Sequence, residues 1–270
     1  MQNGYYQTTG AMVTQFNRLD VITNNLANLN TAGYKRQDVV IADFERIFKE
    51  TRDILPLRNH TRDAAKFVNR TIDRVPNIND VYTDFGAGGM KMTNNSLDIA
   101  LTKDNSFLLV DTPQGVMLTK NGALSLDEDG FLVTKDGYRI LSSDYATQDA
   151  NQRGIQIPQN VQLTIDQDGN VYADEAQISR LFVAGVKELK DLQRQGDNLF
   201  RLENLDDMRD LPNSSSIAQG YIQISNVNAV REMVNLIETN RLVGTYQKVM
   251  ATHMNELNQE AISKLAQVRV

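Results

Sequence analysis

The feature that most constrains this chain is a change in hydrophobic period between its two ends and its middle. Apolar residues near the N-terminus recur at steps of three and four, which places them on one face of a helix. They are Met12, Phe16, Leu19, Ile22, Leu26 and Leu29. From Val227 to about Arg269 there is no proline and one glycine, Gly244, which predicts a second, longer helix. Between these helices apolar and polar residues alternate, which predicts strands.

The C-terminal helix carries two apolar stripes that together are too long for a compact domain to cover. The first contains Val230, Met233, Val234, Leu236 and Ile237, and after a phase slip near Gly244 the second contains Tyr246, Met250, Met254, Leu257, Ala261, Leu265 and Val268. The second stripe follows an eleven-residue repeat, which predicts a seam that is straight or drifts right-handed. A helix of about 40 residues would be roughly 60 Å long. We therefore predict that the terminal helices pack together as a coiled coil and against neighbouring copies of the chain.

The middle of the chain predicts an antiparallel β-domain. Short apolar runs alternate with the turn sequences "TPQG", "KNG", "DEDG" and "KDG", and "VQLTIDQDGNVYAD" repeats the same strand–turn–strand design. Residues 46–85 mix charges, prolines and weak periodicity, so we interpret them as a connector with one short helix. The expected fold class is α+β and mainly β. It comprises a discontinuous terminal helical domain (residues 1–45 and 225–270), the connector (46–85) and a central β-rich domain (86–224).

Composition argues against several classes of protein. The net charge of −6 and the lack of a basic run argue against nucleic-acid binding. The chain contains no cysteine, which excludes a disulfide, a thiolate metal site and a cysteine nucleophile. No stretch approaches the roughly 18 apolar residues of a membrane-spanning helix, so no membrane insertion is expected. The first residues lack the basic and apolar regions of a cleaved signal peptide.

No group of residues predicts an active site. The segment "DQDGN" (166–170) resembles the start of a calcium loop, but its glycine stands at the fourth rather than the sixth position, which favours a plain hairpin turn. The segment "GAGG" (86–89) lacks the Lys-Ser/Thr of a phosphate loop and is interpreted as a flexible join. His60 and His253 lie in different predicted elements, without the arrangement of a catalytic triad. We therefore predict no catalytic, cofactor-binding or metal-binding residues, no cofactor and no enzyme activity.

Three segments resemble the sequence blocks of a known family. "RLDVITNNLANLNTAGYKRQ" (18–37) is similar to the N-terminal signature of the bacterial flagellar axial proteins, the rod and hook components of the basal body. "QGYIQISNVNAVREMVNLIETNR" (219–241) is similar to a second block, and "NNSLDIALTKDNSFLLV" in the β-region shows a weaker similarity. The blocks occur in the family's order. The length of the chain resembles that of rod proteins, of either the distal or the proximal type.

Two short stretches depart from the family pattern. Residues 104–108 stand where the family often has a Gly-Asn/Gln-Gly-Phe-Phe run, and residues 242–246 replace the usual Ala-Tyr-Glu-x-Asn. The second stretch contains Gly244, which costs about 1 kcal/mol relative to alanine inside a helix. We expect a weak point or a packing contact there.

The resemblance implies a structural subunit of the flagellar rod. Paired terminal helices would form an inner domain and the β-rich middle an outer domain, with copies stacked helically into a hollow drive shaft that transmits torque and passes exported subunits. Implied partners are the chain itself, adjacent rod and hook proteins, the flagellar type III export apparatus and bushing-ring proteins, in a rod that spans the periplasm. The alternative is a secreted β-domain enzyme or carbohydrate-binding module on a coiled-coil oligomerisation stalk.

The predicted assembly residues lie in the terminal segments. Surface amides in a packed tube could pair sideways with neighbouring subunits. The alternative is that Asn24, Asn25 and Asn28 are solvated and Asn30 is part of a helix C-cap, close to Gly33 at a positive φ. The full predicted set is Asn24, Asn25, Leu26, Asn28, Asn30, Gly33, Asn226, Val230, Met233, Val234, Ile237, Tyr246, Met250, Leu257 and Leu265.

Overall fold

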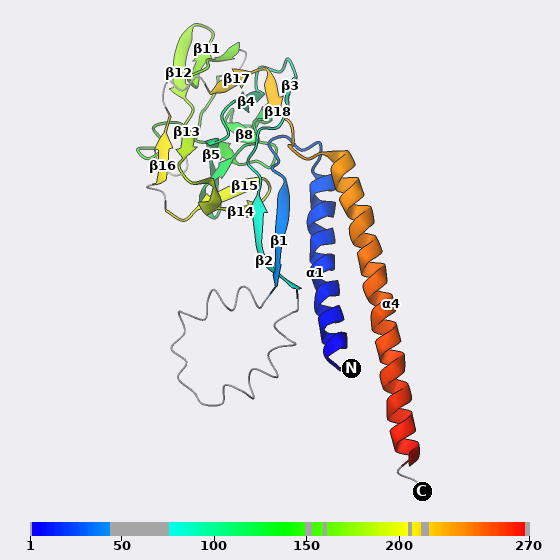
Figure 1. Ribbon diagram of the computed structural model, residues 1–270. Helices are drawn as coiled ribbons and strands as arrows, with labels where there is room; N and C mark the ends of the chain where they lie inside the picture. The colour runs from blue at the N-terminus through cyan, green and yellow to red at the C-terminus, as the bar shows by residue number, and fades with distance from the viewer. Residues whose placement is uncertain are drawn as a thin grey trace, which may run out of the picture. The chain divides into compact units, whose positions relative to one another are not determined.

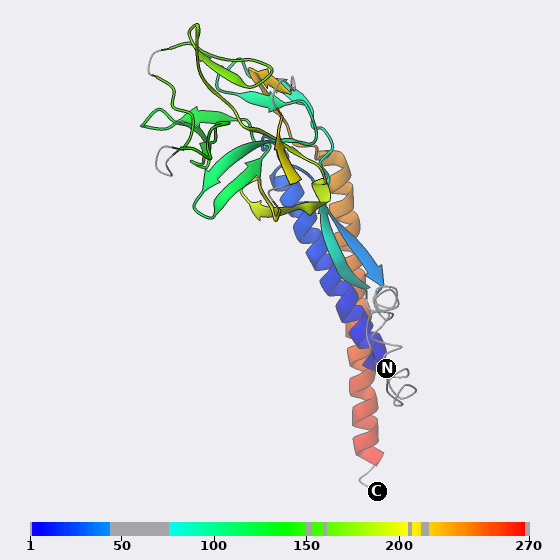
Figure 2. The same ribbon diagram turned by 90° about the vertical axis from the view of Figure 1, so that its left-hand side faces the viewer.

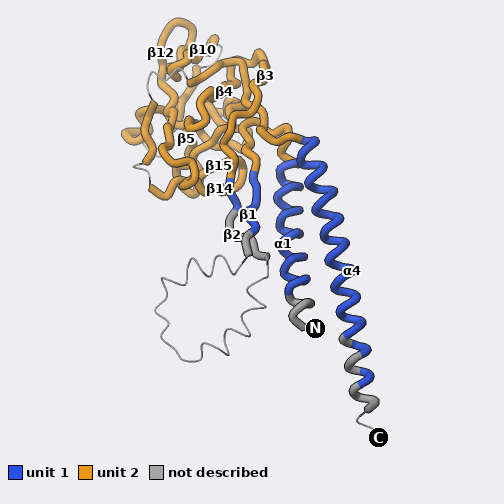
Figure 3. Tube along the Cα trace, viewed as in Figure 1, with its two compact units in different colours: residues 1–26, 37–82, 229–270 blue, residues 27–36, 83–228 orange. Residues whose placement is uncertain are grey.

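A computed structural model describes residues 2–43, 76–148, 153–158, 161–204, 207–211 and 216–267. For residues 2–6, 42–43, 76–80, 257, 260–261 and 264–267 it describes the backbone alone. The chain divides into two compact units, shown in two colours in Figure 3. Unit 1 comprises residues 1–26, 37–82 and 229–270, and unit 2 comprises residues 27–36 and 83–228. The sequence segments of each unit are therefore interleaved.

Unit 1 consists of two helices and a two-stranded ribbon. Helix α1 spans Gln2–Ala27, helix α4 spans Ala229–Gln267, and strand β1 (Gln37–Asp43) pairs with β2 (Pro76–Thr83). The helices run side by side in opposite directions (Figures 1 and 2), and the Thr9 hydroxyl of α1 donates to the Met250 sulfur of α4 at 3.7 Å. Both terminal helices were predicted, although α1 ends before Leu29.

Helix α4 has the predicted exceptional length. Its 39 residues, at 1.5 Å per residue, extend about 58 Å without a break. Gly244 lies within this continuous helix, and nothing lies within 4 Å of where its Cβ would be. The phase slip in the sequence at this glycine therefore does not interrupt the helix.

Strand β2 corrects the interpretation of residues 46–85. Residues 76–83 form a strand, although their sequence was read as part of a connector. The rest of the predicted connector, including its short helix and His60, lies outside the described residues. Strand β2 was missed because its partner β1 precedes it by more than 30 residues, so no local hairpin pattern marks the pair.

Unit 2 is built from short strands, and its strand pairs are antiparallel. The strands are β3 (Met90–Met92), β4 (Ile99–Leu101), β5 (Ser106–Thr112), β6 (Gly115–Thr119), β7 (Leu124–Leu126), β8 (Leu132–Thr134), β9 (Arg139–Ile140), β10 (Leu163–Ile165), β11 (Asn170–Ala173), β12 (Ala176–Arg180), β13 (Val183–Val186), β14 (Leu192–Gly196), β15 (Leu199–Leu202), β16 (Met208–Asp210), β17 (Ile217–Gln219) and β18 (Tyr221–Gln223). A short 3-10 helix, η2, spans Leu189–Asp191. The fold is therefore α+β with mainly antiparallel sheets, as predicted.

The largest sheet of unit 2 is organised around β5. Its main strand order is β14-β15-β6-β5-β9-β8-β7, and β13 joins β5 to β16. The smaller sheets are β10-β11-β12, β17-β4 and β18-β3. Strand β5 pairs with β6 along one edge and with β9 and β13 along the other. Both edges of β5 are therefore paired, and its residues 106–110 are buried.

Two hydrophobic clusters lie on opposite faces of β5, as the period of two requires. Leu108 and Val110 belong to one cluster, and Phe107 and Leu109 belong to the other. In the second cluster the rings of Phe85, Phe107 and Phe200 have centroids 5.2–5.9 Å apart. Unit 2 therefore has a full aromatic and aliphatic core of its own.

Most of the predicted hairpin turns are present. Gly130, Gly137 and Gly169 adopt positive φ in the turns β7–β8, β8–β9 and β10–β11. The segment "KNG" is an exception, because it is not a hairpin turn. Gly122 is required there because a Cβ would overlap the backbone carbonyl of Ile99.

Candidate assembly site

The most prominent feature of unit 1 is a row of exposed apolar side chains on α4. Val230, Met233, Val234 and Ile237 are 72%, 53%, 49% and 68% exposed. Their spacing places them on one face of the helix. All four belong to the predicted assembly set, and the structure places them together and uncovered. Large apolar side chains gathered in this way are typical of surfaces that bind another molecule.

Among the side chains of unit 1 that the structure describes, those that are buried are instead largely polar. Helix α1 buries Thr8, Thr14, Gln15 and Asn25, together with Ala11 and Ile22. Helix α4 buries Glu232 and Thr239, together with Val243. The helices therefore bury polar groups within the chain and leave apolar groups exposed.

The N-terminal apolar stripe is only partly covered within the chain. Only Ile22 of that stripe is buried, whereas Phe16 is 41% exposed. The neighbouring Val13 is also exposed. A helical period shows that one face is apolar, but it does not show whether that face points into the chain or toward solvent.

The second stripe of α4 also differs from the eleven-residue prediction. Tyr246 and Met250 are half-buried, but the next half-buried position is His253, and Met254 is 53% exposed. The less exposed positions therefore follow steps of three and four, typical of a heptad. The side chains of Leu257 and Leu265, both in the predicted set, lie outside the described residues.

Asn25 has a role within the chain that its spacing did not reveal. Its amide nitrogen donates to the Gln37 carbonyl at 2.7 Å, and its amide oxygen accepts from the Gln37 N–H at 3.0 Å. The side chain is 1% exposed. It therefore forms the two backbone hydrogen bonds that a neighbouring strand would form, and it holds the first residue of β1.

The other predicted amides lie in more open positions. Asn24 and Asn30 are exposed, Leu26 is half-buried, and Asn28 accepts a hydrogen bond from the Thr31 hydroxyl at 3.1 Å. Residues 28–30 form turns after α1, so Asn30 lies beyond the helix.

Residues 31–36, which we call the strap, lie between α1 and β1 in the sequence and belong to unit 2. Gly33 donates to the Gln223 carbonyl at 2.8 Å, and the Asn198 amide donates to the Ala32 carbonyl at 3.3 Å. The Arg194 guanidinium lies 4.3 Å from the centre of the buried Tyr34 ring. The strap is thus held by segments far from it in sequence.

Gly33 has the predicted positive φ, +69°, but for more than one reason. A Cβ at this position would overlap the backbone carbonyl of Lys120. The glycine therefore permits both the backbone turn and the close approach of the strap. It lies six residues beyond the end of α1, so it is not the C′ residue of that helix.

Asn226, from the second signature block, joins three segments of unit 2. Its side-chain oxygen accepts from the Arg36 N–H at 2.7 Å, and its nitrogen donates to the carbonyls of Asp84 at 2.8 Å and Gly86 at 3.2 Å. The two signature blocks therefore meet in space, where they fix the end of the strap.

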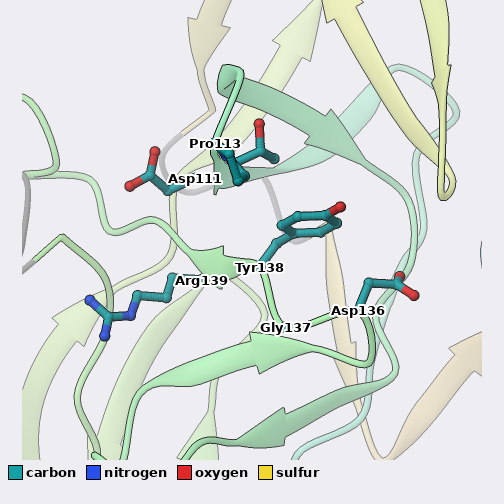
Figure 4. A pocket seen from close by; sticks show the side chains of 7 residues that line it. Asp111, Pro113, Asp136, Gly137, Tyr138 and Arg139 are labelled. Atoms are coloured by element: carbon teal, nitrogen blue, oxygen red, sulfur yellow. The ribbon is translucent and has the colours of Figure 1, made fainter.

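A shallow hollow on unit 2 is the main candidate for chemistry. Its volume is about 390 Å³, and it is lined by Asp111, Thr112, Pro113, Asp136, Gly137, Tyr138 and Arg139 (Figure 4). The Tyr138 hydroxyl donates to Asp197 at 3.2 Å, while Arg139 points away from Tyr138 and lies 3.8 Å from Asp127. Burial and the charge of Asp197 raise the pKa of Asp136. Asp136 and Asp197 repel each other, and the residues that line the hollow contain no nucleophile paired with a base.

The calcium-like segment is a hairpin turn. The Asp166 carboxylate accepts hydrogen bonds from the Asp168 N–H and from both the N–H and the side chain of Asn170. Burial pushes the pKa of Asp166 upward, but these bonds and one from the Gly169 N–H hold it below its usual value. Across the described part of the chain, no three His, Cys, Asp or Glu side chains gather closely enough to hold a metal ion.

Comparisons with known proteins agree with the resemblance of the signature blocks. Residues 6–35 match the family "Flagella basal body rod protein", residues 102–173 match "Flagellar hook protein FlgE/F/G D1 domain", and residues 218–264 match "Flagellar basal body rod FlgEFG protein C-terminal". The chain is 30% identical to the flagellar basal-body rod protein FlgG of Agrobacterium fabrum over 89% of this chain and 91% of that protein.

The chain belongs to the flagellar basal-body rod protein family.

Other relatives of this rod protein are named either FlgF or FlgG. It is 27% identical to FlgF of Caulobacter vibrioides over 99% of this chain and all of that protein, and 28% identical to FlgG of Buchnera aphidicola subsp. Schizaphis graminum over 96% of each. The family is structural, so this rod protein is a subunit of the flagellar basal body and not an enzyme. The alternative of a secreted enzyme or carbohydrate-binding module has no support. Among the helices described, none is both long and apolar enough to cross a membrane.

Sequence reasoning missed the residues that hold the strap. Arg194, Asn198 and Lys120 lie in the β-rich part of unit 2, far from the signature that they contact. A weak signal was available at Asn198, because consecutive Asp197 and Asn198 suit the positive φ that both adopt. No local pattern, however, identifies the strap as their partner.

Proposed function

We propose that this rod protein assembles helically with copies of itself into the hollow shaft of the rod, which transmits torque and passes exported subunits. The terminal segments of unit 1 (within residues 1–45 and 225–270) would form the inner, coiled-coil wall, and the β-rich unit 2 the outer part. The observation that carries this proposal is the exposed row Val230, Met233, Val234 and Ile237 on α4.

Energetics support a partner for this row. Complete burial of an aliphatic side chain of this size contributes about 1.5–3 kcal/mol. The four side chains could therefore supply several kcal/mol at each subunit contact, whereas the polar groups buried in unit 1 supply little hydrophobic stabilisation. Exposed Val13 and Phe16 on α1 extend the apolar surface available to a neighbouring copy.

Other residues of the predicted set are assigned by their exposure. Asn24 and Asn30 are exposed and suit lateral hydrogen bonds between subunits. Tyr246 and Met250 are half-buried and stabilise the helix pair. Asn25, Gly33 and Asn226 act within one subunit, since their contacts are made within the chain.

The partners are assigned from the family. They are adjacent rod and hook proteins along the axis, the flagellar type III export apparatus before assembly, and bushing-ring proteins around the finished rod. The location is the periplasm-spanning part of the basal body. Turning torque would pass through the inner helices, because long helices packed on neighbours resist bending.

The test is a charge placed within the exposed row. Ile237→Glu and Val230→Glu should leave the isolated chain folded, since both side chains are exposed, but should shorten or abolish rods in a cell whose own gene is deleted. Electron microscopy of basal bodies and swimming assays measure the result. Asn240→Glu, an exposed polar position of the same helix, is the matched control and should retain rods. Normal rods with both glutamates present would exclude this face as an assembly surface.

A further inference from the structure

Two lysine amines are buried beneath the strap. Lys35, in the strap itself, is 1% exposed, and its amine donates to the Gly86 carbonyl at 2.9 Å. Lys120 is 2% exposed, its amine donates to the Lys103 carbonyl at 2.7 Å, and it lies 4.9 Å from the centre of the Phe107 ring. Burial of a lysine amine is rare unless it is paired with an opposite charge.

The charges around the pair leave it without a close counter-ion. Within the described ranges, no carboxylate oxygen lies within the 4.0 Å of a salt bridge from either amine. The charged groups that face the pair from the packed segments are Asp84, Asp104 and Arg194, in addition to the two lysines themselves. Asp84 and Asp104 attract the ammonium form from a distance, and the two lysines repel each other. Two full positive charges are therefore unfavourable at this position.

The strap covers the pair directly. Gly33 contacts the backbone of Lys120, and Arg194 donates to the Lys35 carbonyl at 3.4 Å. If the strap left its position, Lys35 would leave with it, and Lys120 would lose both the strap that packs on its backbone and the lysine charge beside its amine. Water would then solvate both ammonium groups.

We propose that docking of the strap onto the rest of unit 2 releases a proton from the buried Lys35–Lys120 pair, so that the strap docks more tightly as the pH rises. The pair is a pH-sensitive latch on the segment that follows α1. This inference does not depend on assembly into a rod, because it concerns contacts within one chain.

The sign follows from proton linkage. Burial, together with the charge of Lys35, lowers the pKa of Lys120 to about 7, against the opposing attraction of Asp104. Burial also lowers the pKa of Lys35, opposed by Asp104 and Asp84. When the strap is undocked, the pKa of Lys120 returns toward its ordinary 10.5. Between these two pKa values the docked form holds fewer protons, so the docking constant rises by up to about tenfold per pH unit, whereas below the lower value it is constant.

Hydrogen exchange on the full chain measures this docking directly. The amides of Gly33 and Arg36 donate hydrogen bonds from the docked strap to Gln223 and Asn226. After correction for intrinsic exchange rates, their opening constant should fall by about tenfold per pH unit between pH 7 and 9. Amides of strand β5 provide the reference for global unfolding. A strap that shows the same protection at every pH, or that changes only in parallel with β5, would contradict the proposal.

Matched variants identify the titrating group. Lys120→Met keeps the length of the side chain and removes its charge, so the pH dependence should fall to less than about threefold across the range. Lys103→Met, at an exposed lysine whose backbone carbonyl remains, should behave like the wild type. Wild-type behaviour of Lys120→Met would overturn the proposal. If that variant does not fold, NMR titration of the lysine side chains in the wild-type chain provides the test. One lysine is expected to titrate with a midpoint near pH 7. If every lysine has a midpoint above about pH 9, the latch is refuted.

Discussion

At the scale of single residues, the amides of the first signature block have unlike roles. Asn25 is buried and forms two hydrogen bonds with the backbone of Gln37, whereas Asn24 and Asn30 face solvent. The sequence shows only that amides are grouped there. Their separate roles depend on where the chain returns after the strap, and no local pattern contains that information.

We expect Asn25→Ala to destabilise the start of β1. The substitution leaves the N–H and the carbonyl of Gln37 without their side-chain partners, at a cost of about 1–3 kcal/mol. Hydrogen exchange of the β1 amides should rise accordingly. Asn24→Ala, on the exposed side of α1, is the control. It should change the free energy of opening of β1 by less than about 0.5 kcal/mol. Equal effects of the two substitutions would argue against the proposed role of Asn25.

Gly33→Ala tests the close approach of the strap. The new methyl group would overlap the Lys120 carbonyl and would also occupy a positive φ, so we expect unit 2 to lose at least about 2 kcal/mol in urea unfolding. Gly137→Ala is a matched control, because Gly137 also has a positive φ but has no atom near its Cβ position. Gly137→Ala should lower the free energy of unfolding only by the cost of an alanine at positive φ, about 1 kcal/mol. If both substitutions cost the same, contact with Lys120 contributes nothing.

At the scale of helices and strands, the sequence predicted the elements better than their surroundings. The terminal helices and the hairpins at Gly130, Gly137 and Gly169 were evident from period and turn residues. Strand β2 was not, because its pairing with β1 is non-local. The apolar face of α4 was identified from its period, and its exposure agrees with the prediction that the rest of the chain does not cover it.

Gly244→Ala should stabilise α4 in the isolated chain. No atom lies within 4 Å of the added Cβ, so the substitution gains the intrinsic preference of alanine, about 1 kcal/mol. Thermal unfolding followed by circular dichroism at 222 nm should show greater helix stability. The reverse substitution at an exposed alanine of the same helix, Ala251→Gly, should lower it by a similar amount. No gain from alanine would imply that Gly244 has a favourable contact within the chain.

At the scale of the whole molecule, the two units differ in how they are stabilised. Unit 2 has two apolar clusters of its own, whereas unit 1 buries mainly polar side chains and exposes apolar ones. The change of hydrophobic period along the sequence already separated the two terminal helices from the β-rich middle. It did not contain the path of the strap, which joins unit 2 through contacts with residues near 120, 198 and 226.

We therefore expect limited proteolysis of the isolated chain to leave a resistant fragment that corresponds to residues 83–228. Sites in α1 and α4 should be cleaved first, because their hydrophobic faces lack a partner in the monomer. Mass spectrometry of the fragments identifies the boundaries. Protection of α4 equal to that of β5 would show that unit 1 is stable without other copies.

The contacts of Asn226 have a consequence for chains that are made or delivered incompletely. The Arg36 N–H donates to the side chain of Asn226, 190 positions later. The first signature block therefore cannot form this hydrogen bond until nearly all of the polypeptide is present. A fragment that ends before Asn226 would lack this hydrogen bond to the segment that follows its first helix. The path of the chain after its first helix therefore depends on a residue of the C-terminal signature block.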